Sequence, residues 1–151
     1  MNANSHHFRQ LQTVLFRELK QLYKQQLNQE LSQITCRVFE KSLVILLEGT
    51  ITQPERILAE HQNTNLVKKV RESLDRIIQP QIKNIVENVM PFKVVDILSD
   101  TTIENNCTGA IVIFELENYS ENVAKLNKTQ RQKLGADDGV TPALDPSINK
   151  A

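Results

Sequence analysis

The chain has 151 residues, and its 18 Lys and Arg balance 18 Asp and Glu, so the formal net charge is zero. This length suits one domain, and a neutral chain lacks the basic excess of a dedicated nucleic-acid binder. Two Cys exclude a disulfide framework, and apolar runs reach only five residues, as from Leu43 to Leu47, too few to span a membrane. No charged-then-apolar leader opens the sequence, so we expect a soluble cytoplasmic protein without membrane insertion.

Helical spacing governs the chain from Phe8 to about Ile34. Apolar residues recur every three or four positions without an intervening Gly or Pro, which predicts a helix of about 25 residues. Its main stripe comprises Phe8, Leu11, Leu15, Leu19 and Leu22. Two interpretations remain open: the helix covers the core of its own domain, or its N-terminal half projects and pairs with another copy. The heptad register is not sustained, so a long coiled coil is not expected.

Two β-hairpins are predicted. Alternation from Thr35 to Phe39 precedes a turn and the apolar run 43–47, which indicates a hairpin whose second strand is central and buried on both faces. The second hairpin consists of strands at 92–98 and 110–116, joined by a polar turn at 99–108. Along its last strand, Val112 and Phe114 face one way and Ile111 and Ile113 the other.

Two helices lie between the hairpins. The segment Thr52-Gln53-Pro54-Glu55 predicts a helix start, because the Thr52 hydroxyl and the Glu55 carboxylate can each bind the other residue's amide. This short helix should end near His61, whose ring can then contact free carbonyls. A longer helix over about 64–89 follows, kinked or divided at Pro80.

These elements define an α+β fold in the order α-β-β-α-α-β-β, with the two hairpins forming an antiparallel-rich four-stranded sheet. We expect a flexible N-terminus at 1–7, a single domain at 8–117 and a weakly structured to disordered tail at 118–151, with one weak helix at 120–134. Charge is uneven along the chain: residues 1–80 carry 11 basic and 8 acidic groups, and residues 81–120 carry 2 and 6. The second hairpin is therefore the acidic end.

No catalytic, cofactor or metal motif emerges from the residues. The Gly residues are scattered, and the three His (His6, His7 and His61) lack fixed partners. Cys36 is expected to be a small core residue and Cys107 an exposed thiol in a turn. An acidic group of Asp96, Asp100, Glu115 and Glu117 has no spacing that selects a cation. We therefore expect a protein that is not an enzyme and that binds no cofactor or metal.

The segment from Leu43 through Gly49 to Glu55 resembles the MpsC-like domain family, whose hallmark is an apolar strand, a Gly-containing turn and a "(L/I)TxxE" helix start. The likeness covers about residues 10–117, through Leu66-Val67-Lys68-Lys69-Val70-Arg71 and Val94-Val95 to the last strand. The family, a domain of unknown function, is tied by name to a sodium-translocating, membrane-potential-generating system of bacteria. Members often carry a Gly-rich turn between the first helix and the first strand. Here Asn28-Gln29-Glu30-Leu31 stands at that place, so the helix can continue.

The resemblance implies an accessory or regulatory protein of a cation- or inorganic-ion-transport system, cytoplasmic or peripheral to the inner face of the membrane. It would act as a homo-oligomer, with a dimer favoured, and dock on a membrane transporter subunit. The candidate partner-binding residues are Leu11, Leu15, Leu19, Leu22, Lys68, Lys69 and Arg71. The alternative is a small-ligand or nucleic-acid-binding module that uses the basic face of the Lys68–Arg76 helix, although nucleic acid is not favoured as a partner.

Overall fold

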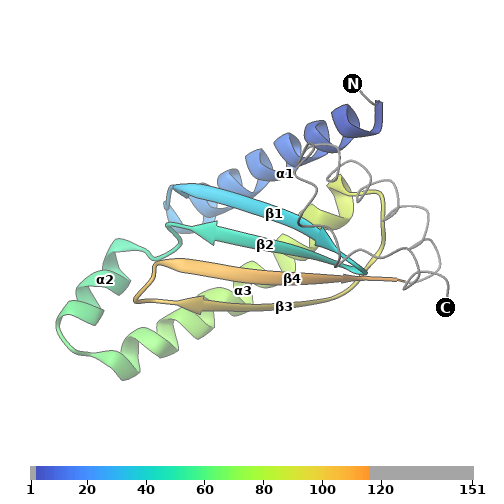
Figure 1. Cartoon of the computed structure of the whole chain (residues 1–151). Coiled ribbons are helices and arrows are strands. Elements are labelled where there is room, and N and C mark those ends of the chain that lie inside the picture. The colour runs from blue at the N-terminus through green and yellow to red at the C-terminus, as the bar shows by residue number, and fades with distance from the viewer. Residues whose placement is uncertain (1–2, 116–151) are drawn as a thin grey trace, which may run out of the picture.

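The computed structural model describes residues 3–115, with side chains from residue 6. The elements, in chain order, are α1 (Ala3–Leu27), β1 (Gln33–Phe39), β2 (Ser42–Glu48), α2 (Gln53–Glu60), α3 (Thr64–Val89), β3 (Val94–Thr102) and β4 (Cys107–Phe114). The predicted α+β class, the element order and the two hairpins are confirmed (Figure 1). None of the helices in this part of the chain has the length and apolar character needed to cross a membrane.

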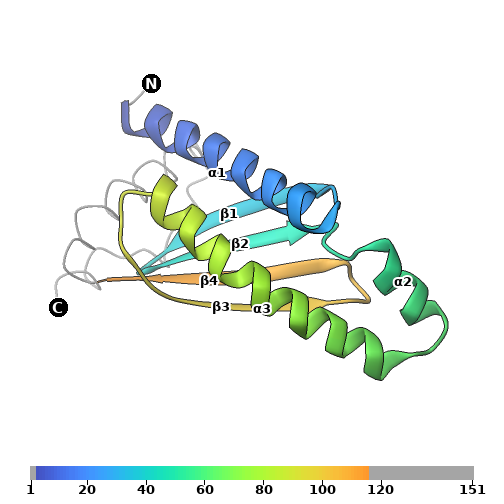
Figure 2. The same cartoon turned by 180° about the vertical axis from the view of Figure 1, so that it is seen from behind.

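The four strands form one antiparallel sheet in the order β1-β2-β4-β3. Each hairpin supplies two adjacent strands, and β2 and β4 join the hairpins at the centre. Helices α1 and α3 lie on the same face of the sheet, as Figures 1 and 2 show from opposite sides, and α2 lies beyond the strand ends. The described chain therefore has two layers.

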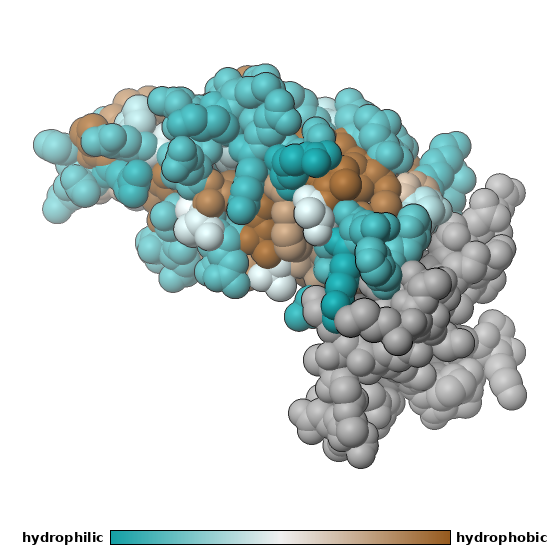
Figure 3. Space-filling view, turned by 90° about the horizontal axis from the view of Figure 1, so that it is seen from above, coloured by the Kyte–Doolittle hydropathy of each residue, from teal (hydrophilic) through white to brown (hydrophobic). Residues whose placement is uncertain are grey.

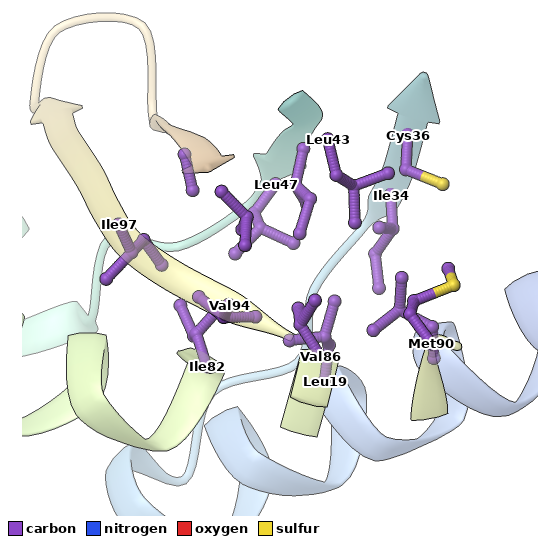
Figure 4. Close-up of a cluster of buried hydrophobic side chains, with 14 of the residues drawn as sticks. Leu19, Ile34, Cys36, Leu43, Leu47, Ile82, Val86, Met90, Val94 and Ile97 are labelled. Atoms are coloured by element: carbon purple, nitrogen blue, oxygen red, sulfur yellow. The ribbon is translucent and has the colours of Figure 1, made fainter. Parts of the chain in front are cut away.

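The core lies between the sheet and the two long helices. Alternate residues of each strand point to this layer because successive side chains in a strand point to opposite faces. Figure 4 shows Leu43 and Leu47 of β2 facing Leu19 of α1 and Ile82 and Val86 of α3, and all five are buried. Burial of these apolar side chains supplies most of the driving force that holds the layers together.

The prediction that β2 is buried on both faces is wrong. Its strand is central, but Val44 and Leu46 keep about two fifths of their side chains exposed, at 40% and 39%. Helices α1 and α3 lie on the opposite face of the sheet, so no described element covers the side chains of Val44 and Leu46. In β4 the predicted alternation is confirmed, with Val112 and Phe114 buried and Ile111 exposed.

Helix α1 differs from its predicted bounds at both ends. It begins at Ala3, so residues 3–7 are helical where the sequence predicted a flexible segment. It ends at Leu27, because Asn28 adopts a left-handed backbone with φ of 50° and the Gln29 amide donates back to the Tyr23 carbonyl over 3.2 Å. The expected continuation of the helix into Leu31 is therefore wrong: Asn28 forms a left-handed helix end of the kind usually made by Gly.

Smaller differences affect the other elements. Helix α3 runs through Pro80 as one helix. The second hairpin has longer strands than predicted, so its turn shortens to residues 103–106 and Asp100 lies within β3. The predicted weak helix at 120–134, the tail at 118–151 and Leu116 of the predicted last strand lie outside the described residues.

Adjacent isoleucines on α3 test the two-layer arrangement. Ile78 is 2% exposed and Ile77 is 57% exposed. We expect Ile78→Ala to lower the free energy of unfolding by about 2–5 kcal/mol through lost burial and a residual cavity. Ile77→Ala, the same chemical change one residue away, should stay within about 0.5 kcal/mol. Urea unfolding followed by circular dichroism measures both, and equal losses would contradict the assigned faces of α3.

Candidate functional site

The turn that follows β2 is held in a single conformation. Gly49 has φ of +82°, and a Cβ built there would lie 2.9 Å from the Ser32 amide nitrogen, so a side chain is excluded both by backbone conformation and by space. Asn106, in the turn between β3 and β4, fixes the segment from the other side: its carbonyl accepts from the Gly49 amide at 2.9 Å and its Oδ1 from the Ile51 amide at 2.8 Å. The turn therefore positions Thr50 and Thr52 relative to the sheet.

A buried ion pair joins the two helices that follow this turn. Glu55, in the first turn of α2, is 0% exposed, and Arg71 of α3 is 4% exposed. The Arg71 Nε donates to Glu55 Oε1 at 2.7 Å, and Nη2 donates to Glu55 Oε2. Such a two-pronged pair fixes orientation as well as distance, because the planar guanidinium matches the carboxylate edge.

The same carboxylate also completes the predicted capping box of α2. Glu55 Oε2 accepts from the Thr52 amide at 2.8 Å and from the Thr52 hydroxyl at 2.8 Å. Four hydrogen bonds thus converge on one buried carboxylate, two from Thr52 and two from Arg71. They offset the cost of removing a negative charge from water.

A chain of hydrogen bonds extends from Arg71 to the sheet. Its Nη2 donates to the Thr50 carbonyl at 3.1 Å and its Nη1 to Asp75 Oδ1 at 3.2 Å. Asp75 Oδ1 also accepts from the Thr101 hydroxyl of β3 at 3.3 Å, and that hydroxyl lies 2.8 Å from the Thr108 hydroxyl of β4. The Thr108 hydroxyl donates in turn to the Thr50 hydroxyl at 3.0 Å, which closes the network on the turn after β2.

Two ionisable groups in this network have shifted pKa values. Burial raises the pKa of Tyr23 to about 12, against the opposing effects of the Arg71 charge and of the hydrogen bond with Thr108. Burial also raises the pKa of Asp75, although the Arg71 charge and the hydrogen bonds from Arg71 and Thr101 pull in the opposite direction. Tyr23 places α1 in contact with the network, which therefore touches both layers of the fold.

The comparison with protein families matches residues 7–116 to MpsC, described as the Na+-translocating membrane potential-generating system. This match spans more than two thirds of the chain. The chain belongs to the MpsC family. Comparison with curated proteins gave no match, and comparison with solved structures gave none either.

In this MpsC chain, the predicted partner-binding stripe of α1 lies mostly inside the protein. Leu15, Leu19 and Leu22 are buried in the core, and Leu11 is half-buried against it. Of the two interpretations left open by the sequence, the structure supports the one in which α1 covers the core of its own domain. The leucine stripe packs within the chain and is not presented to another copy.

The predicted basic residues of α3 separate into two groups. Lys68 and Lys69 are exposed, as expected, but Arg71 is buried and paired with Glu55. The prediction that Arg71 belongs to the exposed basic face of the Lys68–Arg76 helix is therefore wrong. The sequence carried a usable signal, since Arg71 follows the buried Val67 by four positions and precedes the buried Ile78 by seven, which is the spacing of one helix face.

The remaining sequence candidates are engaged locally. Asp96 and Asp100 are exposed on β3, and each carboxylate accepts from the amide of the next residue. Glu115 pairs with Lys93 at 3.3 Å, and Glu117 lies outside the described residues. Within the described residues no group of three or more His, Cys, Asp or Glu side chains is arranged to hold a metal ion.

The structure shows the burial and the contacts of Cys36, Cys107 and His61. Cys36 is buried in the core as predicted, and it accepts from Gln12 Nε2 at 3.3 Å. Cys107 begins β4, where the sequence predicted a turn, and is half-buried. The His61 ring contacts a carbonyl at the end of α2, with its Nδ1 2.8 Å from the Ile57 oxygen, but this carbonyl is not free as predicted, because it also accepts from the His61 amide at 3.1 Å.

Removing one member of the buried pair should be costly. We expect Arg71→Met to lower the free energy of unfolding by about 3–5 kcal/mol, because it leaves the Glu55 carboxylate buried without its counter-charge. The double variant Glu55→Leu/Arg71→Met should lose less, since neither charge remains. Glu30→Ala, which breaks the exposed Lys24–Glu30 pair, serves as the control and should cost less than about 1 kcal/mol. Urea unfolding measures all three variants. If Arg71→Met lowers the free energy of unfolding no more than Glu30→Ala does, the Glu55–Arg71 pair does not stabilise the fold as described.

The ionisation of Tyr23 gives a second prediction. Its folded-state pKa of about 12 lies above the value of about 10 for an exposed tyrosine, so the folded state retains a proton that the unfolded state releases. The free energy of unfolding should therefore fall as pH rises from about 10 to about 12. Phenolate absorbance should show a late step that disappears in Tyr23→Phe, which keeps only Tyr119. Identical late titration in both proteins would refute the assignment.

Proposed function

We propose that this MpsC-family chain is a non-enzymatic accessory protein of a cation-transport system. It acts in the cytoplasm or at the inner face of the membrane, as a homo-oligomer that docks on a membrane subunit. The observation that carries the proposal is the family match over residues 7–116, whose description names a Na+-translocating, membrane potential-generating system. A chain of this kind would contribute through binding, while a membrane partner supplies the ion path.

The polar network supports a binding role. The two carboxylate oxygens of Glu55 receive four hydrogen bonds, and the Arg71 guanidinium reaches three different residues. A general acid or base needs an accessible lone pair or proton near a substrate, whereas these groups are buried and committed to one another. The network therefore serves best as a rigid junction that fixes α2 and the start of α3 on the sheet.

The end of the molecule formed by α2 and the start of α3 is the docking surface in this proposal. Ile57 and Leu66 are exposed there at 48% and 42%, and Lys68 and Lys69 are exposed next to Leu66. In Figure 3 apolar surface is visible at this α2 end beside hydrophilic surface. Apolar residues bordered by cations suit a partner surface that is apolar with an acidic rim, because the charges then steer the encounter.

The alternative of a nucleic-acid module loses support from the same residues. Arg71 is buried, so the Lys68–Arg76 face keeps fewer cations than expected. Glu72 is exposed between Lys68 and Arg76, one helical turn from each, and reduces the positive potential there. Phosphate recognition depends on the number of cations that meet the backbone, so this face is a weak candidate.

Loss of the protein should impair a sodium-dependent membrane potential. In energised inverted vesicles from a deletion strain, we expect the part of the potential that requires Na+ and resists a protonophore to fall. Purified full-length chain should restore it. Lys68→Glu/Lys69→Glu should restore it poorly, because the charge at the docking surface is reversed.

The matched control is Lys20→Glu/Lys24→Glu, which makes the same charge change on exposed positions of α1. This control should restore the potential as fully as the wild-type chain. If the deletion leaves the sodium-dependent component intact, the transport role is wrong. If both charge variants fail equally, the docking surface is not at the α2 end.

A further inference from the structure

The sheet face opposite the helices is apolar at its centre. Val44, Leu46, Leu98 and Ile111 have exposures between 39% and 55% on this face. Strand register places three of them in one row across the sheet, since Leu98 pairs with Ile111 and Ile111 with Val44. No other described element packs on this face (Figures 1 and 2). Contiguous exposed apolar surface of this kind marks an interaction site.

The same face carries opposite charges at its two edges. Asp96 and Asp100 lie on the edge strand β3, and Arg37 lies on the edge strand β1. In the register, Arg37 belongs to the row of Val44, Ile111 and Leu98, which lies between the rows of the two aspartates. The open face is therefore acidic along one edge, apolar in the middle and basic along the other.

We propose that a second copy of this chain packs on the open face, sheet against sheet, about a two-fold axis parallel to the strands and between β2 and β4. This inference rests on the homo-oligomeric part of the proposed function and assigns its surface. Residues that pair across the four strands form a row, such as Arg37, Val44, Ile111 and Leu98. Rotation about this axis places each row of one copy over the same row of the other copy, with the strand order reversed. The β1 edge of one copy then lies over the β3 edge of the other. Two stacked sheets of this kind lie about 10 Å apart.

In this arrangement the basic edge of each copy faces the acidic edge of the other copy. Arg37 of one copy faces the Leu98 row of the other, between Asp96 and Asp100. Stacked sheets are rotated by about 30°, and rotation in either sense moves the guanidinium toward one of the two carboxylates. A two-fold axis perpendicular to the strands would instead set like edges together, which opposes association.

The rows also match in shape. Gly109 pairs with both Leu46 and Asp100 in the register, so the axis places Gly109 of one copy opposite Leu46 of the other. A Cβ built on Gly109 meets no atom within 4 Å, so the position is open. The glycine therefore leaves a recess for the leucine of the second copy, and symmetry makes this contact twice.

Pairing along the β3 edge is less suited to association. The carboxylates of Asp96 and Asp100 accept from the amides of Ile97 and Thr101 at 2.8 and 2.9 Å. Charged side chains that bind their own strand's amides discourage strand addition. Contact across the apolar face is therefore favoured over extension of the sheet at β3.

Sedimentation of the purified full-length chain over a concentration series tests the dimer. We expect a species with twice the 17.3 kDa chain mass. Gly109→Val should raise the dissociation constant by about tenfold or more, because the side chain fills the recess for Leu46. The monomer should remain as stable as the wild type, since the added atoms meet open space.

Charge reversal gives an independent readout. Arg37→Glu should also weaken the dimer, and adding Asp96→Arg and Asp100→Arg to that variant should restore it, because the edges again have opposite signs. Lys20→Glu, the same charge change on α1, should have no effect.

Three results would overturn the inference. A chain that stays monomeric throughout excludes the dimer, and if Gly109→Val then lowers the free energy of unfolding, another segment of the same chain occupies the face. A dimer insensitive to both Gly109→Val and Arg37→Glu uses a different surface. Failure to restore association by the triple charge variant excludes the proposed axis. None of these measurements depends on the sodium-dependent potential. A monomeric chain would therefore remove the homo-oligomeric part of the proposed function, while the transport part is tested separately by the vesicle experiment.

Discussion

The placement of α2 and of the start of α3 on the sheet depends on one buried ion pair, Glu55 with Arg71. Burying each charge costs several kcal/mol, and the cost is offset only where hydrogen bonds replace those with water. Here the bonding groups come from the turn after β2, from α2 and from α3, and the network extends through Asp75 to Thr101 of β3 and from there to Thr108 of β4. An arrangement that moved any of these segments would leave a buried charge without partners, so the pair specifies the geometry of the whole junction.

The pair also explains why the short helix α2 has a fixed position. Eight residues supply too few internal hydrogen bonds to hold a helix in place by themselves. Glu55 contributes twice, first as the residue that caps the start of α2 and then as the counter-charge of Arg71. Gly49 and Asn106 set the path into this helix, so the strand–turn–helix element that resembles the family is also the element with the most specific polar contacts.

Much of the fold could be predicted from local pattern. Helical spacing, alternation and the Thr52–Glu55 capping signature each report a short-range preference, and the structure agrees with the elements they predict. The partner of Glu55 could not be identified, because it lies 16 positions away and capping chemistry says nothing about distant charges. Its residue type predicts that Arg71 lies on the exposed basic face of α3, whereas its spacing from Val67 and Ile78 indicates the buried face. The apolar run of β2 is ambiguous for a related reason. A continuous apolar run is typical of a strand that is buried on both faces, but whether the second face is buried depends on whether other elements cover both faces of the sheet.

The polar network and the open face are linked by the register of the sheet. Thr101 and Thr108 point toward the helices and bind Asp75 and Thr50, so their strand neighbours Asp100 and Gly109 must point to the opposite face. A slip of β3 by one residue relative to β4 would expose Thr101 and turn Asp100 toward the core, and a slip of β4 relative to β2 would do the same to Thr108 and Gly109. The network that anchors α2 and α3 thus also selects which residues form the open face. The acidic edge and the recess at Gly109 follow from the orientation of Thr101 and Thr108 toward the helices.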